Sequence, residues 1–283
     1  MRLQTKILLL LIPLIVVPLL ALGWIAYSML MDDARNRTQK QLTTLLEQIS
    51  IQTRSQLRTA RANARLFAST NLIQRYLGDN QPPAEKELLQ AEVSELLFSY
   101  QIAYPEYYEI RLLSQDGIEL VRSALGRIKN LTADEAGNPH FIASSTQTDT
   151  IYTAFFHNPD NGEPALLVSK PLFLPDAGSR DGKTSLEPKG YLQLTVDLGF
   201  LENHVKKESP GGKGRIVFTD ADGNILFRRQ GSALPERVPD ELFGELRRGL
   251  ALAKPVTGSF RNELVRFRGV KLDDWLYMFA YYP

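Results

Sequence analysis

The sequence predicts an α+β protein in which an N-terminal transmembrane helix continues into a long stalk helix, followed by two tandem antiparallel-sheet modules. Three observations support this prediction. Ile7–Met31 contains no charged residue, and Asp32–Leu77 contains neither proline nor glycine. Ile110–Arg122 and Ile216–Arg228 align without gaps at an offset of 216 − 110 = 106 residues. Each is a pair of strands joined by Asp-Gly, a hairpin signal because glycine tolerates the positive φ of tight turns.

The uncharged N-terminal segment is about 25 residues long, and a helix needs about 20 to cross the hydrocarbon core of a membrane. Arg2 and Lys6 precede it, which favours a cytoplasmic N-terminus. The alternative is a cleavable signal peptide with Ala21-Leu22-Gly23 as a poor cleavage site. Both alternatives place the rest of the chain outside the cytoplasm.

The composition excludes several functions. The net charge is +1 and no basic patch is evident, so we expect no nucleic-acid partner. The three histidines lack metal-ligand spacing, and there is no cysteine, nucleophile elbow or phosphate loop, so we expect no enzyme, cofactor or metal. Asp220-Ala-Asp222-Gly-Asn224 begins like a calcium loop. Its glycine comes two positions early, however, and Gly231 replaces the bidentate Glu, so we interpret it as a turn.

The stalk helix, predicted over Asp32–Leu77, has one apolar stripe with steps of three and four residues. A stripe of this width suits packing on a sheet or pairing with a second copy. We expect a parallel homodimer along its membrane-proximal part. The residues of the apolar stripe are Leu42, Leu46, Ile49, Thr53, Leu57, Ala60, Ala64 and Phe67.

After Gly78 the pattern predicts a first module over residues 78–208. It contains a helix over Ala84–Tyr100 and a short helix over Pro139–Ser145 with Asn138 as its cap. A polar loop spans Asp176–Lys189, and a short connecting helix is expected over Gly199–Lys207. The strands are predicted at Tyr107–Leu113, Ile118–Ser123, Thr150–Phe156, Ala165–Phe173 and Gly190–Asp197.

A smaller second module is predicted over residues 209–283. It contains the Ile216–Arg228 hairpin and a helix over Asp240–Leu250. Strands at Ser259–Arg268 and Trp275–Tyr281 complete it. The repeated hairpin suggests that both modules are copies of one unit, and coincidence between two ordinary hairpins is the alternative.

The anchor, the long helix and the stretches Tyr108–Arg122 and Gly190–Leu198, with Pro171 ahead of the latter, resemble the double Cache family of PAS-like bacterial ligand sensors. The resemblance implies an extracytoplasmic sensor region that is not itself an enzyme, in a receptor of the inner membrane with its bulk in the periplasm. It also implies a cytoplasmic partner, a diguanylate cyclase, a histidine kinase or a chemotaxis effector. The implied division is 1–31 cytoplasmic tip and anchor, 32–77 stalk helix, 78–208 membrane-distal module and 209–283 membrane-proximal module.

Amino-acid-binding members of this family carry an Arg-x-Trp-Tyr stretch, and Asn138-Pro-His-Phe141 lies at that position. Phe141, Tyr152 and Asp197 keep the chemical type of the family's contacts. Asn138 replaces the carboxylate-clamping arginine, and Ala154 replaces an acid. An amino-acid ligand is therefore disfavoured, whereas a pocket in the same place is expected.

The candidate ligand contacts are Arg111, His140, Tyr152, Lys170 and Asp197. Strand alternation places Tyr107, Glu109 and Arg111 on one face and Tyr108, Ile110 and Leu112 on the apolar face. Arg111 and Lys170 in one cleft would suit a small anionic ligand. Binding is expected to close the Asp176–Lys189 loop and to shift the long helix. Two alternatives remain open: these residues are solvated strand ends, or the chain is a membrane-anchored structural or partner-binding module without a small-molecule ligand.

Overall fold

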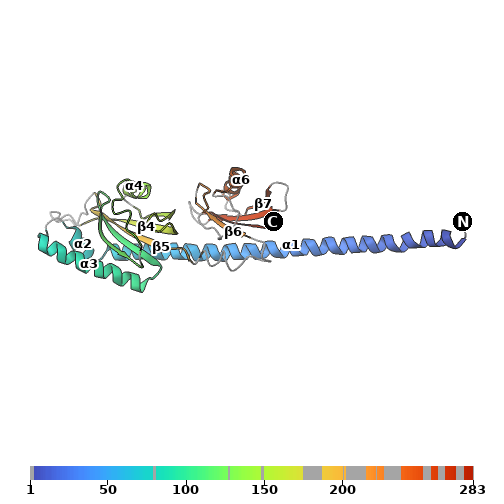
Figure 1. Cartoon of the computed structure of the whole chain (residues 1–283), viewed down its shortest axis with the longest axis horizontal. Helices are drawn as coiled ribbons and strands as arrows, with labels where there is room; N and C mark the ends of the chain where they lie inside the picture. The colour runs from blue at the N-terminus through green and yellow to red at the C-terminus, as the bar shows by residue number, and fades with distance from the viewer. Residues whose placement is uncertain are drawn as a thin grey trace.

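A computed structural model of the chain describes residues 3–78, 81–126, 128–147, 150–174, 187–199, 201, 215–220, 222–225, 237–250, 256–260, 265–271 and 277–282. Its longest element is α1, Leu3–Ala68, a single helix of 66 residues. At 1.5 Å per residue it is about 100 Å long. Two antiparallel sheets lie one after the other along its second half, and the N-terminal half projects beyond them (Figure 1).

The projecting part of α1 is apolar and exposed. Within the described side chains, Ile15–Ala34 is long and apolar enough to cross a membrane, and none of it is buried. Trp24 is 75% exposed. These properties are compatible with membrane anchoring, and a signal sequence near the N-terminus would share them.

The long helix ends at Ala68, nine residues earlier than the predicted end at Leu77. A separate helix, α2 (Asn71–Leu77), follows. Ser69 Oγ donates to the carbonyl of Leu66 at 2.7 Å, and Thr70 is extended, with φ −69° and ψ 128°. Serine and threonine offer the backbone such local alternatives to helical hydrogen bonds, and this ends the helix without glycine or proline.

The first sheet has five antiparallel strands in the order β2-β1-β5-β4-β3. The bounds are close to those predicted, and the last of the five strands matches its prediction. They are β1 (Tyr107–Ser114), β2 (Glu119–Ala124), β3 (Tyr152–His157), β4 (Pro164–Leu172) and β5 (Gly190–Asp197).

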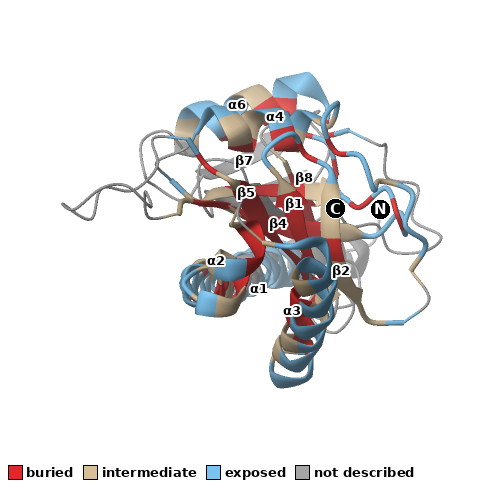
Figure 2. Ribbon diagram, turned by 90° about the vertical axis from the view of Figure 1, so that its left-hand side faces the viewer, coloured by how far each residue is buried: buried red, intermediate tan, exposed pale blue. Residues whose placement is uncertain are grey.

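Helices cover both faces of this sheet (Figure 2). One face packs against α1 and α3 (Pro83–Ala103). Its core contains alternate residues of the strands, such as Ile110, Val168 and Leu194. The other face carries the short helix α4 (Pro139–Thr146), whose cap Asn138 accepts a hydrogen bond from the backbone N–H of His140 at 2.9 Å. The predicted cap is therefore confirmed.

The second sheet has four antiparallel strands in the order β6-β9-β8-β7 and also contacts α1. Its elements are β6 (Arg215–Thr219), α6 (Asp240–Leu250), β7 (Val256–Phe260), β8 (Val265–Lys271) and β9 (Tyr277–Tyr282). The prediction of one strand over Ser259–Arg268 was wrong: β7 and β8 pair as two antiparallel strands. The connecting helix beyond residue 201 and the second half of the Ile216–Arg228 hairpin lie outside the described residues.

The two Asp-Gly turns have the same geometry. Gly117 and Gly223 both have φ of 88°. Ser114 N–H donates to Ile118 O at 2.8 Å, and Asp220 N–H donates to Asn224 O at 3.0 Å. These pairs differ by the same offset of 106 residues. Phe141 of α4 lies against Gly117, and Phe243 of α6 lies against Gly223, so each turn is covered by the helix that follows it.

The apolar stripe of the long helix packs inside its own protomer. Leu46 and Ile49 are fully buried in the core shared with the sheets, as is Ala64. The prediction that this stripe forms the homodimer contact is therefore wrong, because the stripe is buried within one chain. The stripe faces the sheets, which was the other possibility that its width allowed.

Candidate ligand-binding site

An open cleft of about 690 Å³ lies on the α4 side of the five-stranded sheet. One wall is the segment 132–140, which includes the start of α4. A second wall is the end of β3 and its turn, and the turn after β6 contributes Asp220 and Asn224. We call this space the α4–β3 cleft. Its volume is within the range of about 300–1,000 Å³ that is usual for small-molecule sites.

His140, in the first turn of α4, is one of the titratable residues that line the cleft. Its Nδ1 lies 3.0 Å from the hydroxyl of Tyr152, and its ring meets that of Phe156 edge-on at 5.3 Å. Burial lowers the pKa of His140 below its usual value, although the charge of Glu135 acts in the opposite direction. The imidazole is therefore neutral at pH 7. Burial likewise raises the pKa of Tyr152.

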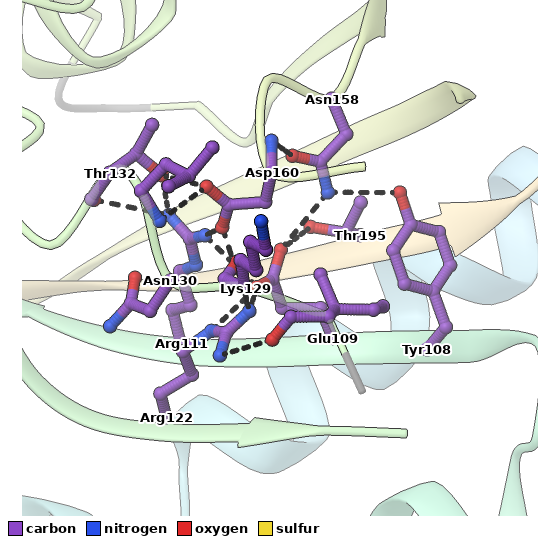
Figure 3. A network of polar contacts seen from close by, with 12 residues as sticks. Tyr108, Glu109, Arg111, Arg122, Lys129, Asn130, Thr132, Asn158, Asp160 and Thr195 are labelled. Atoms are coloured by element: carbon purple, nitrogen blue, oxygen red, sulfur yellow. Dashed lines mark hydrogen bonds and ion pairs between the residues drawn. The ribbon is translucent and has the colours of Figure 1, made fainter. Parts of the chain in front are cut away.

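Beneath the cleft lies a buried ionic network centred on Arg111 (Figure 3). The guanidinium group of Arg111 donates to Glu109 at 2.9 Å and to Glu135 at 2.6 Å, and it also contacts Asp160. Arg122 joins the network through Glu109 at 2.7 Å. Burial alone would lower the pKa of Arg111, but the charges of Glu109, Asp160 and Glu135 outweigh it, and the pKa is raised.

The network holds the walls of the cleft in place. Asp160, in the turn after β3, accepts hydrogen bonds from the backbone N–H of Leu131 at 2.9 Å and from the hydroxyl of Thr132 at 3.2 Å. Asn158 in the same turn donates to Glu109 at 3.3 Å. The segment before α4 and the β3–β4 turn are therefore both fixed to the sheet. Between the network and His140 lies a narrow space in which the centre of a water molecule can move through only about 10 Å³, room for about one water molecule.

Of the five predicted contacts, His140 lines the cleft and Tyr152 contacts His140. Arg111 lies below it, with its charge balanced by carboxylates. Asp197, at the exposed end of β5, accepts a hydrogen bond from Gly199 N–H at 2.9 Å and does not line the cleft.

Lys170 lies on the opposite face of the sheet. It shares that face with every second residue of β4, namely Leu166, Val168 and Leu172, which belong to the core beside α1. Burial lowers the pKa of Lys170, and the charge of Arg65 in α1 adds to this effect. The expectation that Arg111 and Lys170 share one anion-binding cleft was therefore wrong. The sheet separates them, and Arg111 is neutralised by acids.

Tyr107 and Tyr108, the first two residues of β1, lie on the opposite faces of the sheet from those predicted. The pairing of β1 with β5 shifts between Tyr107 and Glu109, as at a β-bulge. Tyr107 therefore points into the core, where its hydroxyl accepts a hydrogen bond from Asn63 at 2.7 Å. Burial raises the pKa of Tyr107 to about 12, although this hydrogen bond acts in the opposite direction. The hydroxyl of Tyr108 instead reaches Asn158 on the site face.

Sequence reasoning missed the carboxylates that surround Arg111. Glu109 could have been found, because it lies two residues away on the same strand face. Asp160 lies between Asn158-Pro159 and Asn161-Gly162, a composition that indicates only a turn. Glu135 lies in a segment without periodicity. Nothing local in the sequence shows that either acid folds back onto β1.

No protein-family model matches the chain, and no curated protein matches it. Solved structures do match. The domain of a sensory box/GGDEF family protein from Vibrio parahaemolyticus has a TM-score of 0.58 at 14% identity, over 87% of this chain and 97% of that chain. The extracellular domain of the histidine kinase vpHK1S-Z8 has a TM-score of 0.57 at 16% identity, over 87% and 92%.

A third match is the ligand-binding domain of the Campylobacter jejuni chemoreceptor Tlp3 in complex with 4-methylisoleucine, with a TM-score of 0.58 at 15% identity, over 87% and 90%. The chain has the fold of a bacterial sensory domain. The resemblance to Cache sensors is therefore confirmed at the level of the fold. The matches cover 87% of this chain and at least 90% of each neighbour.

Proposed function

We propose that the chain is the extracytoplasmic input region of a membrane-anchored signalling receptor and that it binds a small molecule in the α4–β3 cleft. The cleft itself is the observation that supports this most strongly. It combines a suitable volume with polar, acidic and aromatic side chains above a fixed ionic network. Two of the similar solved structures are a histidine kinase extracellular domain and a chemoreceptor domain with a bound ligand, which agrees with this role.

In this proposal the five-stranded sheet and its helices form a membrane-distal module over 78–208. The four-stranded sheet forms a shortened membrane-proximal module over 209–283. The matched turns at Gly117 and Gly223 support a common origin. Residues 1–31 form the cytoplasmic tip and anchor, and the bulk of the chain lies in the periplasm. Homodimer contacts would fall on the exposed first part of α1.

Signalling would proceed by movement of α1. Arg61 of α1 donates a hydrogen bond to Thr153 of β3 at 2.9 Å. In the same strand, the adjacent Tyr152 contacts His140 of the cleft, and Phe156 lines the cleft. A ligand that moves β3 therefore acts on α1 directly. Helix shifts of about 1–2 Å are sufficient to change a coupled effector, here a diguanylate cyclase, a histidine kinase or a chemotaxis protein. The chain itself is not catalytic in this proposal.

The test is a thermal-shift screen of the full chain in nanodiscs against small metabolites. A ligand at 100 times its dissociation constant should add about 2.7 kcal/mol to the free energy of unfolding. Binding should be lost in Phe156→Ala, which removes an aromatic wall of the cleft, and kept in Phe98→Ala on the outer face of α3. A complete screen without a hit, or hits that survive Phe156→Ala, would refute the proposal.

One observation favours a second function, the binding of a protein partner. The outer face of α3 carries Leu88, Phe98 and Ile102, which are 61%, 50% and 66% exposed. These positions follow a three-four spacing through Ala91 and Glu95, the pattern of a helix that pairs with another helix. Loss of signalling in Phe98→Asp with ligand binding unchanged would assign the partner contact to α3.

A further inference from the structure

We propose that the α4–β3 cleft is specific for an extended organic dication, such as a diamine, and that this ligand bridges the two sheets. The inference rests on the proposed function and deepens it by naming the class of ligand. It replaces the anionic ligand that Arg111 and Lys170 had suggested.

The charge of the cleft is negative. Among its described lining residues, Asp134, Glu135 and Asp220 are acids, and none is Lys or Arg. Asp134 and Asp220 use their carboxylates to accept hydrogen bonds from their own turns, and neither forms an ion pair with a described Lys or Arg. His140 adds no positive charge at pH 7, because its pKa is lowered by burial.

The network beneath the cleft adds to this negative field. Its described members comprise four carboxylates, those of Glu109, Glu119, Glu135 and Asp160, and two guanidinium groups. The formal balance is an excess of two negative charges, by subtraction of two cations from four anions. Glu135 belongs both to this network and to the wall of the cleft. An anionic ligand would be repelled by the acids of the cleft wall and by those of the network.

The size of the cleft favours an organic cation over a metal ion. No group of three or more His, Asp or Glu side chains within the described residues is arranged to hold a metal ion. The cleft, at about 690 Å³, is much larger than an ion requires and suits a small organic molecule. Phe155 and Phe156 are among its lining residues, and aromatic rings of this kind also attract organic cations.

The positions of the acids call for two charges on the ligand. Asp134 and Glu135 belong to the segment before α4, whereas Asp220 belongs to the turn after β6 in the second sheet. A ligand with a positive group at each end neutralises both sides at once. Binding therefore fixes the five-stranded sheet to the second sheet, which is the one closer to the anchor along α1 (Figure 1).

The experiment is isothermal titration calorimetry of the full chain in nanodiscs with three probes that share one tetramethylene chain. These are 1,4-diaminobutane, adipate and butane-1,4-diol. The diamine should bind, more weakly as salt is raised, and the dianion and the diol should not. Asp134→Asn and Asp220→Asn should each weaken diamine binding about tenfold, the loss of one charge-assisted hydrogen bond.

Asp116→Asn is the matched control, because it removes an exposed turn carboxylate that does not line the cleft. It should leave diamine affinity unchanged. Binding of adipate in preference to the diamine, or diamine binding that is unaffected in both cleft variants, would overturn the inference. If the screen finds only uncharged or anionic ligands that Phe156→Ala abolishes, this inference fails while the proposed function stands. If no small molecule binds at all, both fail.

Discussion

The guanidinium group of Arg111 is buried, and only 4% of the side chain is exposed. Its charge is stabilised by contacts with three carboxylates and with the hydroxyl of Thr132. Such an arrangement is tolerated only when every partner is present, because a buried charge left unpaired is costly. Arg111 therefore positions the walls of the cleft and is not a free anchor for a ligand.

Replacing Arg111 by Met should lower the free energy of unfolding by about 3–5 kcal/mol, because Glu109, Glu135 and Asp160 would remain buried without their cation. Urea unfolding of the full chain in detergent, followed by circular dichroism, measures this loss. Arg75→Met is the control: its pair with Glu85 at 3.4 Å is largely exposed and should contribute about 0–1 kcal/mol. Equal effects of the two changes would contradict the structural role of the network.

The lowered pKa of His140 predicts that the free energy of unfolding depends on pH. Its pKa is lowered in the folded chain, so the unfolded chain takes up the proton first as the pH falls. Stability should therefore be fully present above the ordinary histidine pKa of about 6.5 and decline below it. His140→Gln should flatten this decline in a series of urea titrations between pH 7.5 and 5, whereas Tyr152→Phe, which keeps the titrating ring, should retain it. An unchanged slope in His140→Gln would show that other groups cause the decline.

At the scale of single residues, contacts between neighbours in the sequence could be predicted, whereas contacts between distant residues could not. The Asn138 cap follows from local spacing, because its partner His140 lies two residues away. His140 and Tyr152 were candidates for one site, and their contact joins α4 to β3. The partners of Arg111 come from positions 24 and 49 residues away. Only the folded topology brings these acids to β1, and no pattern within one element encodes it.

At the scale of elements, the stripe of α1 shows how one pattern serves two structures. Its three-four spacing is equally compatible with a helical partner and with a sheet. The sheets themselves decide, because their apolar faces need covering and α1 is the helix that runs along both. Likewise, the helix end at Ala68 depends on serine and threonine contacts that periodicity does not register.

Leu46→Asp tests this placement of α1. Leu46 is fully buried, so an unpaired carboxylate there should cost more than about 4 kcal/mol of unfolding free energy. Ile51→Asp, on the same helix but 63% exposed, should change stability by about 0.5 kcal/mol or less. If Leu46→Asp kept full stability and only dissociated a dimer in analytical ultracentrifugation, the stripe would be a contact between protomers instead.

The turn at Gly117 provides a second test at this scale. A Cβ there would lie 2.8 Å from the ring of Phe141, whereas at Gly126, which also has positive φ, no atom lies within 4 Å. Both Gly→Ala changes should cost about 1–2 kcal/mol for the left-handed backbone. Gly117→Ala should cost a further 1–3 kcal/mol or so for overpacking α4. Equal costs in thermal unfolding would show that α4 does not press on the turn.

For the whole molecule, the order of elements was predictable and the arrangement of the sheets along α1 was not. Hairpin signals and helical periodicity identified most of the elements, because they depend on neighbouring residues. That one helix contacts both sheets, with α4 and α6 on their other faces, follows from contacts between distant segments. The cleft arises from this arrangement, since it uses side chains of α4, β3 and the turn after β6.

The central claim is that a small molecule bound in the α4–β3 cleft acts on both sheets and on α1. Hydrogen–deuterium exchange of the full chain in nanodiscs, with and without a saturating hit from the thermal-shift screen, tests it most directly. The account predicts slower exchange at the start of α4, at the end of β3 and in the turn 220–224, with a change in α1 around Arg61. Protection confined to another surface, such as the outer face of α3, with no change at α4 or β3, would contradict it.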